Sequence, residues 1–151
     1  MIYKIACVGR IKEQSIRNML FDIERDINRS NRLVIIEVPD EKIPKKVSES
    51  VALAIKEKEG KRLLDKIDRN DYVAALCIDG RKYSTADLKK LSDKVKDREY
   101  TSLTFVIGGS LGLCDDVIKR ADIRISFSDM TFPHQLMRLM LADQIQLICD
   151  M

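Results

Sequence analysis

The residues best suited to chemistry lie in one stretch of the chain, between positions 105 and 138. This stretch contains the only histidine, His134, and an arginine four residues later, Arg138. Histidine exchanges protons near neutral pH, and arginine can hold a phosphate or a carboxylate through paired hydrogen bonds. Because residues four apart share a helix face, we expect the two side chains to lie together. A histidine at a helix start can also simply bond the backbone, and both roles stay open.

A glycine-rich turn, Gly108 to Gly112, follows an apolar run that ends at Ile107. Glycine permits positive φ and a close approach of the backbone to a ligand. The spacing is G-G-x-x-G, which differs from the dinucleotide fingerprint G-x-G-x-x-G, and Phe127 and Ser128 stand where an acidic residue would end the next strand. The turn therefore argues against an NAD-type enzyme. It leaves two interpretations open, a plain tight turn and one wall of a pocket.

A second loop, Phe127 to Phe132, follows the apolar run that begins at Ile123. Loops that leave the carboxyl ends of neighbouring strands form small-molecule pockets in α/β folds. The two loops together therefore predict such a pocket. An ordinary strand-to-helix connection is the alternative for this loop.

Other kinds of site are poorly supported. His134 has no cysteine or acidic partners at the spacing of a zinc site. A triad of Ser128, Asp129 and His134 lacks the sharp turn that presents a nucleophilic serine. The four cysteines are scattered without a C-x-x-C pair, so we expect free thiols in a reducing cytoplasm.

Composition describes one globular domain of 151 residues, with 45% hydrophobic and 34% charged residues. No apolar run approaches the ~20 residues of a membrane span, and the start of the chain lacks the features of a signal peptide. The net charge is only +3. Lysines and arginines gather at 42–46, 56–62 and 89–98, but acidic residues interleave with most of them. Solvated helix faces are the favoured interpretation of these runs.

Hydrophobic periodicity predicts alternating strands and helices. This pattern implies an α/β domain with a mostly parallel sheet of five to six strands and helices on both faces. The predicted strands are Ile2 to Val8, Leu33 to Val38, Tyr72 to Ile78 (turned by Asp79-Gly80), Leu103 to Ile107 and Ile123 to Phe127. The predicted helices are Lys12 to Asn28, Glu49 to Ile67, Ser84 or Thr85 to Val95, Cys114 to Arg120, and a last helix opened by Pro133.

Four segments carry a specific resemblance: IIEVPDEK, KEKEGKRLL, IGGSLGL and SFSDMTFPHQLMR, in this order. They resemble the ribosomal large-subunit methyltransferase H family, SPOUT-class enzymes that use S-adenosylmethionine to methylate N3 of a pseudouridine in 23S rRNA. The resemblance implies a C-terminal trefoil knot, a cytoplasmic homodimer with the last helix in its interface, and the assembled ribosome as partner, with no membrane and no metal. The last helix is apolar around much of its circumference, which suits both core and subunit contact.

The resemblance also assigns site residues. It places S-adenosylmethionine against Leu76, Gly108 and the loop residues Phe127, Ser128, Asp129, Met130, Thr131 and Phe132. A loop of apolar and small polar residues suits the ring and the edge of adenine, although Leu76 also fits simple core packing. His134 and Arg138 are the expected catalytic residues, with Arg138 beside the phosphate of RNA or the cofactor.

The end of the chain departs from the family pattern. Asp143 keeps the family's acidic residue, but Gln146 and Leu147 replace a tyrosine-arginine pair, and the chain stops at Met151 without the usual basic tail. An alternative function is therefore a homologue that binds the cofactor but is catalytically impaired.

Overall fold

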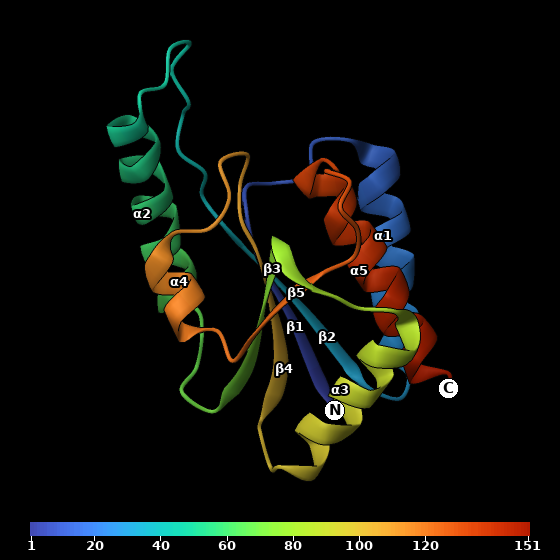
Figure 1. Cartoon of the computed structure of the whole chain (residues 1–151). Coiled ribbons are helices and arrows are strands. Elements are labelled where there is room, and N and C mark those ends of the chain that lie inside the picture. Colours follow the sequence, from blue (N-terminus) through green and yellow to red (C-terminus); the bar gives the residue numbers. More distant parts are fainter.

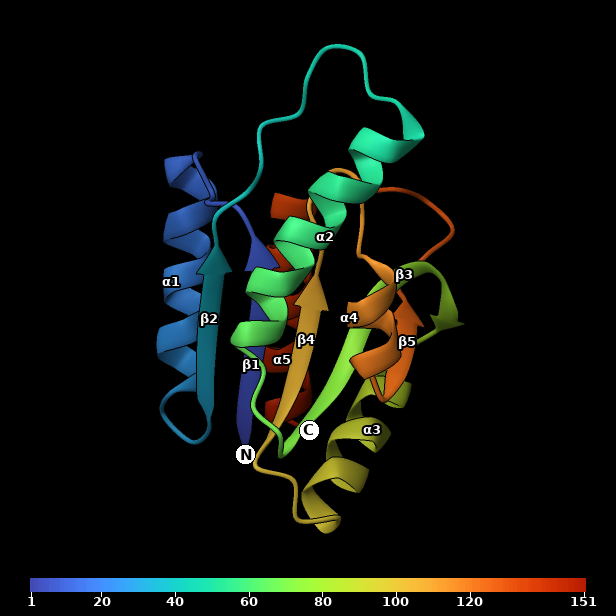
Figure 2. The same ribbon diagram turned by 90° about the vertical axis from the view of Figure 1, so that its left-hand side faces the viewer.

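A computed structural model describes all residues, 1–151, as alternating strands and helices around one sheet (Figure 1). All neighbouring strands are parallel, in the order β2-β1-β4-β3-β5 (Figure 2). The predicted α/β class and parallel sheet are confirmed, with five strands. The elements are β1 (Ile2–Val8), α1 (Gln14–Ile27), β2 (Arg32–Val38), α2 (Glu49–Asp65), β3 (Asp71–Lys82), α3 (Thr85–Asp97), β4 (Ser102–Ile107), α4 (Asp115–Arg120), β5 (Ile123–Ser126) and α5 (His134–Cys149).

Helices cover both faces of the sheet: α1, α3 and α5 lie on one side, and α2 and α4 on the other (Figure 1). Side chains of a strand point alternately to the two faces, so β1 serves both cores. Tyr3, Ile5 and Cys7 belong to the larger core, and Ala6 and Val8 to the smaller one. A sheet buried on both faces explains why the strands read as nearly continuous apolar runs.

The last helix contributes to the larger core, as expected. Leu141, Ala142, Ile145 and Ile148 are buried there, and α5 packs mainly along α1. Leu136 and Leu147 remain exposed. No helix of the chain is long and apolar enough to cross a membrane, and all four cysteines are free thiols.

Local signals fixed several element boundaries. Ser84 caps α3 through the predicted capping box, because its hydroxyl accepts the Asp87 N–H while Asp87 accepts the Ser84 N–H.

Gly60 lies inside α2 despite a cost of ~1 kcal/mol in helix propensity. A Cβ at Gly60 would lie 2.2 Å from the Cys114 Sγ, so the missing side chain allows α2 to approach α4.

The predicted end of the third strand is wrong. Asp79-Gly80 does not turn the chain away from the sheet, because β3 resumes its pairing with β5 and continues to Lys82. Residues 77–80 instead leave the register, since Leu76 and Arg81 both pair with Ile125. A Cβ at Gly80 would lie 2.8 Å from the Ile125 backbone, a contact that only glycine avoids. Glycine at this position thus allows β3 to return to β5 after the excursion.

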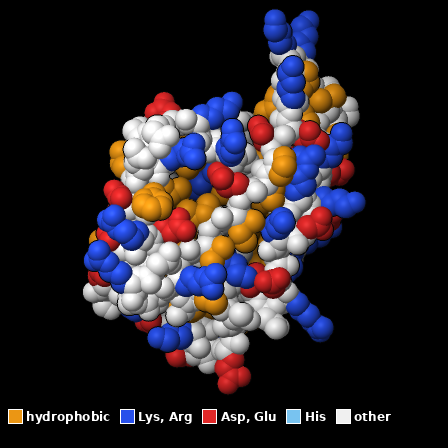
Figure 3. Space-filling view, turned by 180° about the vertical axis from the view of Figure 1, so that it is seen from behind, with side chains coloured by type: hydrophobic (Ala, Val, Ile, Leu, Met, Phe, Trp, Pro, Cys, Tyr) orange, Lys and Arg blue, Asp and Glu red, His pale blue; other side chains and the backbone are white.

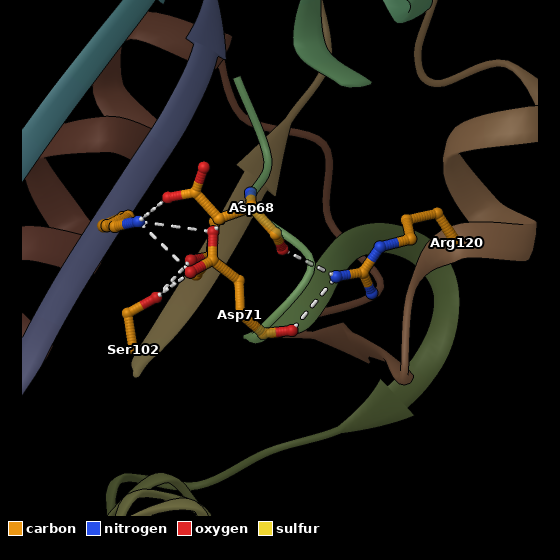
Figure 4. Close-up of polar contacts among 6 residues, drawn as sticks. Asp68, Asp71, Ser102 and Arg120 are labelled. Atoms are coloured by element: carbon orange, nitrogen blue, oxygen red, sulfur yellow. Dashed lines mark hydrogen bonds and ion pairs between the residues drawn. The ribbon is translucent and has the colours of Figure 1, made fainter. Parts of the chain in front are cut away.

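A polar network closes the amino end of the sheet (Figure 4). The fully buried carboxylate of Asp71 accepts hydrogen bonds from Ser102 Oγ at 2.6 Å, the Asp68 N–H at 3.0 Å and Lys4 Nζ at 3.1 Å. Arg120 of α4 donates to the carbonyls of Asp68 and Asp71, both at 3.1 Å. Every partner of the buried charge is therefore supplied from within the chain, which is the condition for tolerating it.

We expect this network to make stability depend on acid pH. Burial alone would raise the pKa of Asp71, but the hydrogen bonds from Ser102, the Asp68 N–H and Lys4 outweigh it, and the net pKa lies below the ordinary 3.8. A carboxyl with a depressed folded pKa stabilises the fold above its unfolded pKa, and this contribution is lost as the pH falls through the folded pKa.

Asp71→Asn should therefore lower the free energy of unfolding by roughly 2 kcal/mol at pH 7 and flatten its decline below pH ~4. Urea unfolding between pH 2 and 7 measures both effects. Asp68→Asn is the matched control, because Asp68 binds the same lysine but is 75% exposed, and we expect less than ~1 kcal/mol. Equal losses for the two variants would contradict the role of burial.

Candidate functional site

An open cavity lies at the carboxyl ends of β3, β4 and β5, where the sequence predicted a pocket. It contains about 650 Å³ of space, part of it open to solvent. No Asp, Glu, Lys or Arg lines it. Predicted site residues that line it are Leu76, Gly108, Phe127, Ser128, Met130, Thr131, Phe132 and His134.

The glycine turn forms one wall of the cavity and is also a tight turn, so both interpretations of it hold. Gly112 has φ +89° and donates its N–H to the Gly109 carbonyl at 3.0 Å. A Cβ at Gly108 would lie 2.7 Å from the Gly112 carbonyl carbon. Glycine is thus required at Gly108 for the turn to fold back on itself, before any ligand is considered. Backbone groups rather than side chains face the cavity here.

The loop after β5 forms the opposite wall. Ser126 Oγ donates to the Ser128 carbonyl at 2.9 Å, and Ser128 Oγ accepts the Met130 N–H at 3.1 Å. These short-range bonds hold the loop in a turn that faces the cavity. Asp129 is the exception among the expected residues: it does not line the cavity and forms an ion pair with Lys82.

The floor of the cavity comes from β3. Leu76 lines it and also packs against the larger core, so both of its expected roles apply. Cys77 and Ile78 line it as well, and the sequence analysis missed them. They belong to the excursion of residues 77–80, which periodicity did not predict. The only signal in the sequence is Gly80, which in the dipeptide Asp79-Gly80 predicts a turn.

His134 lies at the edge of the cavity, at the first residue of α5. Its ring makes no hydrogen bond within the chain, so the expected backbone-bonding role is not seen. Burial lowers the pKa of His134, the nearby Arg138 charge lowers it further, and Asp40 opposes both. The imidazole is therefore neutral at physiological pH and free to accept a proton.

Arg138 is fully buried and does not line the cavity, which corrects the expectation that it meets an RNA phosphate. Its Nη1 donates to Glu37 Oε2 at 2.8 Å and its Nη2 to the Val8 carbonyl at 3.0 Å, while Nε has no partner. Of the two interpretations of this arginine, the structure shows the carboxylate. The guanidinium ties α5 to the ends of β1 and β2, one helical turn from His134.

Because Arg138 is buried, we expect the loss of its carboxylate partner to lower the free energy of unfolding more than the loss of the partner of the more exposed Arg62. Glu37→Ala would leave the guanidinium buried without its carboxylate, at a cost of ~3 kcal/mol in the free energy of unfolding. Glu41→Ala is the control, because Glu41 pairs at 3.1 Å with Arg62, whose side chain is 35% exposed, and we expect ~1 kcal/mol or less. Urea unfolding compares them, and similar losses would mean that Arg138 regains water when Glu37 is removed.

No cluster of three His, Cys, Asp or Glu side chains has the geometry to hold a metal ion. The chemistry that this site can support therefore draws on an uncharged cavity, backbone groups of two loops and one neutral histidine.

Comparison with known proteins agrees with this geometry. A family model described as predicted SPOUT methyltransferase matches residues 1–148. Proteins named ribosomal RNA large subunit methyltransferase H are similar over 96% of this chain and 91% of their own: one from Clostridioides difficile is 47% identical, one from Enterococcus faecalis 44% and one from Lactiplantibacillus plantarum 43%. With its parallel sheet and its cavity between two loops, this chain belongs to the SPOUT methyltransferase family, among the relatives of ribosomal RNA large subunit methyltransferase H.

Proposed function

We propose that this protein transfers a methyl group from S-adenosylmethionine to N3 of a pseudouridine in the RNA of the large ribosomal subunit. The observation that carries the proposal is the cavity, because its walls are the two loops that the sequence had assigned to the cofactor. The names of the relatives support ribosomal RNA as the substrate. Action on assembled ribosomes would place the protein in the cytoplasm.

The residues of the cavity fit this cofactor. Leu76, Phe127 and Phe132 offer apolar surface for a purine ring, and the peptide groups of the two loops offer donors and acceptors for its edge. The bound cofactor supplies an already activated methyl group. The protein then has to position the acceptor base in line with that group and remove its N3 proton.

His134 is the residue that we assign to the proton. It is neutral at physiological pH, lies at the edge of the cavity and has no partner in the chain. These are the properties of a general base. Arg138 acts through His134 as a positioning residue, because its bonds to Glu37 and Val8 hold the first turn of α5 in place.

The trefoil knot and the homodimer remain part of the proposal. The path of the chain is compatible with a knot, since β5 is the edge strand beside β3 while α5 packs against α1, β1 and β4. Exposed Leu136 and Leu147 on α5, with Met19 and Phe21 on α1, offer apolar surface for a second subunit. The alternative of an impaired homologue is not favoured, because the family match continues through α5 to residue 148.

Two half-buried thiols provide an internal test of cofactor binding. Cys77 lines the cavity, whereas Cys149 lies at the far end of α5 and does not. Burial raises the pKa of both thiols, so alkylation should be followed at alkaline pH. We expect S-adenosylhomocysteine to slow alkylation of Cys77 about tenfold or more at saturation and to leave Cys149 unchanged, as read by peptide mass spectrometry. Equal rates at Cys77 with and without the ligand would place the cofactor elsewhere.

Methyl transfer tests the reaction itself. Assembled ribosomes that lack the modification should gain one N3-methylpseudouridine in the large subunit when incubated with the protein and S-adenosylmethionine. His134→Ala should lower the rate constant of transfer by 10²–10⁴, the usual contribution of a general base, while the affinity for S-adenosylhomocysteine changes little. Asp129→Ala, in the same loop but outside the cavity, is the control and should keep the wild-type rate. Methylation at another base or atom would refute the proposed specificity.

A further inference from the structure

An exposed arm, residues 42–51, stands off the body of the molecule between β2 and α2 (Figure 2). All ten residues of the arm are exposed, and the first buried residue of α2 is Ile55. The arm includes the first turn of α2, which Ser48 caps by accepting the Val51 N–H at 3.3 Å. It is therefore an ordered projection in which no residue is buried.

The base of the arm is fastened to the body. Arg62 donates to the Pro39 carbonyl at 2.9 Å and to Glu41 at 3.1 Å, and the buried Glu59 accepts the Glu41 N–H at 3.0 Å. Glu59 also abuts the glycine turn, because a Cβ at Gly109 would lie 3.0 Å from its Oε1. Glu59 thus holds the base of the arm and lies against the turn that forms one wall of the cavity.

The charge of the arm is mainly positive and free of ion pairs. Lys42, Lys45 and Lys46 are exposed, and none of them lies within ion-pair distance of an acidic group. We had interpreted this lysine run as a solvated helix face, but it lies on a loop. The other two runs do lie on α2 and α3, and each holds an ion pair, Lys58 with Glu41 and Lys89 with Asp93.

Apolar side chains accompany the lysines. Ile43, Val47 and Val51 are each 38–39% exposed along the arm. Figure 3 shows the basic side chains at the tip of this projection, with hydrophobic side chains behind them. These side chains belong to neither hydrophobic core of the protein, and a part of each faces solvent beside the lysines.

Position links the arm to the cavity. The arm follows the carboxyl end of β2, and the cavity opens at the carboxyl ends of β3, β4 and β5, which is the same end of a parallel sheet. The arm and the cavity mouth therefore lie on the side of the molecule that a large substrate would approach. The cavity itself has no lysine or arginine to bind phosphate.

We propose that the arm binds the phosphate backbone of the ribosomal RNA next to the methylated base, and that Lys42, Lys45 and Lys46 neutralise phosphates there. Lysine side chains on a projection provide affinity without reading sequence, whereas the cavity selects the base. The inference rests on the proposed function, since it assumes that RNA is the substrate.

Binding to large ribosomal subunits at several salt concentrations tests the inference. The arm variant Lys42→Gln/Lys45→Gln/Lys46→Gln removes three charges. Its control, Lys90→Gln/Lys94→Gln/Lys96→Gln, removes three exposed lysines from α3, which runs back to the amino end of the sheet. A second control, the three arm lysines changed to arginine, keeps the charge.

We expect the arm variant to bind subunits at least about tenfold more weakly near 100 mM salt, with a salt slope shallower by about 2, at ~0.7–0.9 per phosphate contact. The α3 control should stay within twofold of wild type, and the arginine variant should bind like wild type. Affinity for S-adenosylhomocysteine should be unchanged in all three variants, because no arm lysine lines the cavity.

Wild-type affinity and slope in the arm variant would overturn the inference. If the arm variant loses binding to large ribosomal subunits but binds protein-free large-subunit RNA like wild type, the partner of the arm is a ribosomal protein. If the variant alone sediments differently from the wild-type protein, the arm instead contacts a second copy of this chain. Either result also overturns the inference. If the wild-type protein binds subunits with the expected slope but transfers no methyl group, the proposed function fails while the arm remains an RNA contact.

Discussion

The buried guanidinium of Arg138 is the interaction on which the arrangement of the site depends. A charge with no exposure to water is tolerated only when it is paired and hydrogen-bonded. Glu37 and the Val8 carbonyl supply these partners from the ends of β2 and β1, about one hundred residues earlier in the chain. The start of α5 must therefore dock at one place. His134 and the loop after β5 are consequently held beside the cavity.

Close backbone contacts impose the second constraint. Gly80 passes the Ile125 backbone and Gly108 passes Gly112, in both cases at distances that exclude a Cβ. The first contact lies at the end of the excursion that contains Cys77 and Ile78 of the floor, and the second lies within the turn that forms a wall. The uncharged lining of the cavity is thus built largely from backbone geometry. Side-chain chemistry enters mainly through His134.

Local patterns predicted most of the fold. Strand periodicity, the Ser84 capping box and the helical spacing of apolar residues depend on neighbours in the sequence, and these predictions were confirmed. Of the eight cofactor residues that the resemblance implies, all but Asp129 line one cavity. The failures involve distant partners: Glu37 for Arg138, Lys82 for Asp129, and Ile125 for Gly80. No periodicity carries that information, because each partner is set by the tertiary contact itself.

The lysines of the arm lie outside a cavity that has no charged side chains, and this arrangement has a physical consequence for the proposed reaction. The proposed reaction would consume the positive charge of the donor and the negative charge of the deprotonated N3, and it would leave two neutral products with the N3 proton held on His134 at the edge of the cavity. An uncharged cavity stabilises separated charges poorly and neutral products well, and so favours transfer once both reactants are bound. Lysines inside the cavity would repel the cationic donor, yet RNA binding requires positive charge. Placing the lysines on the arm, at the same end of the sheet but outside the cavity, satisfies both requirements.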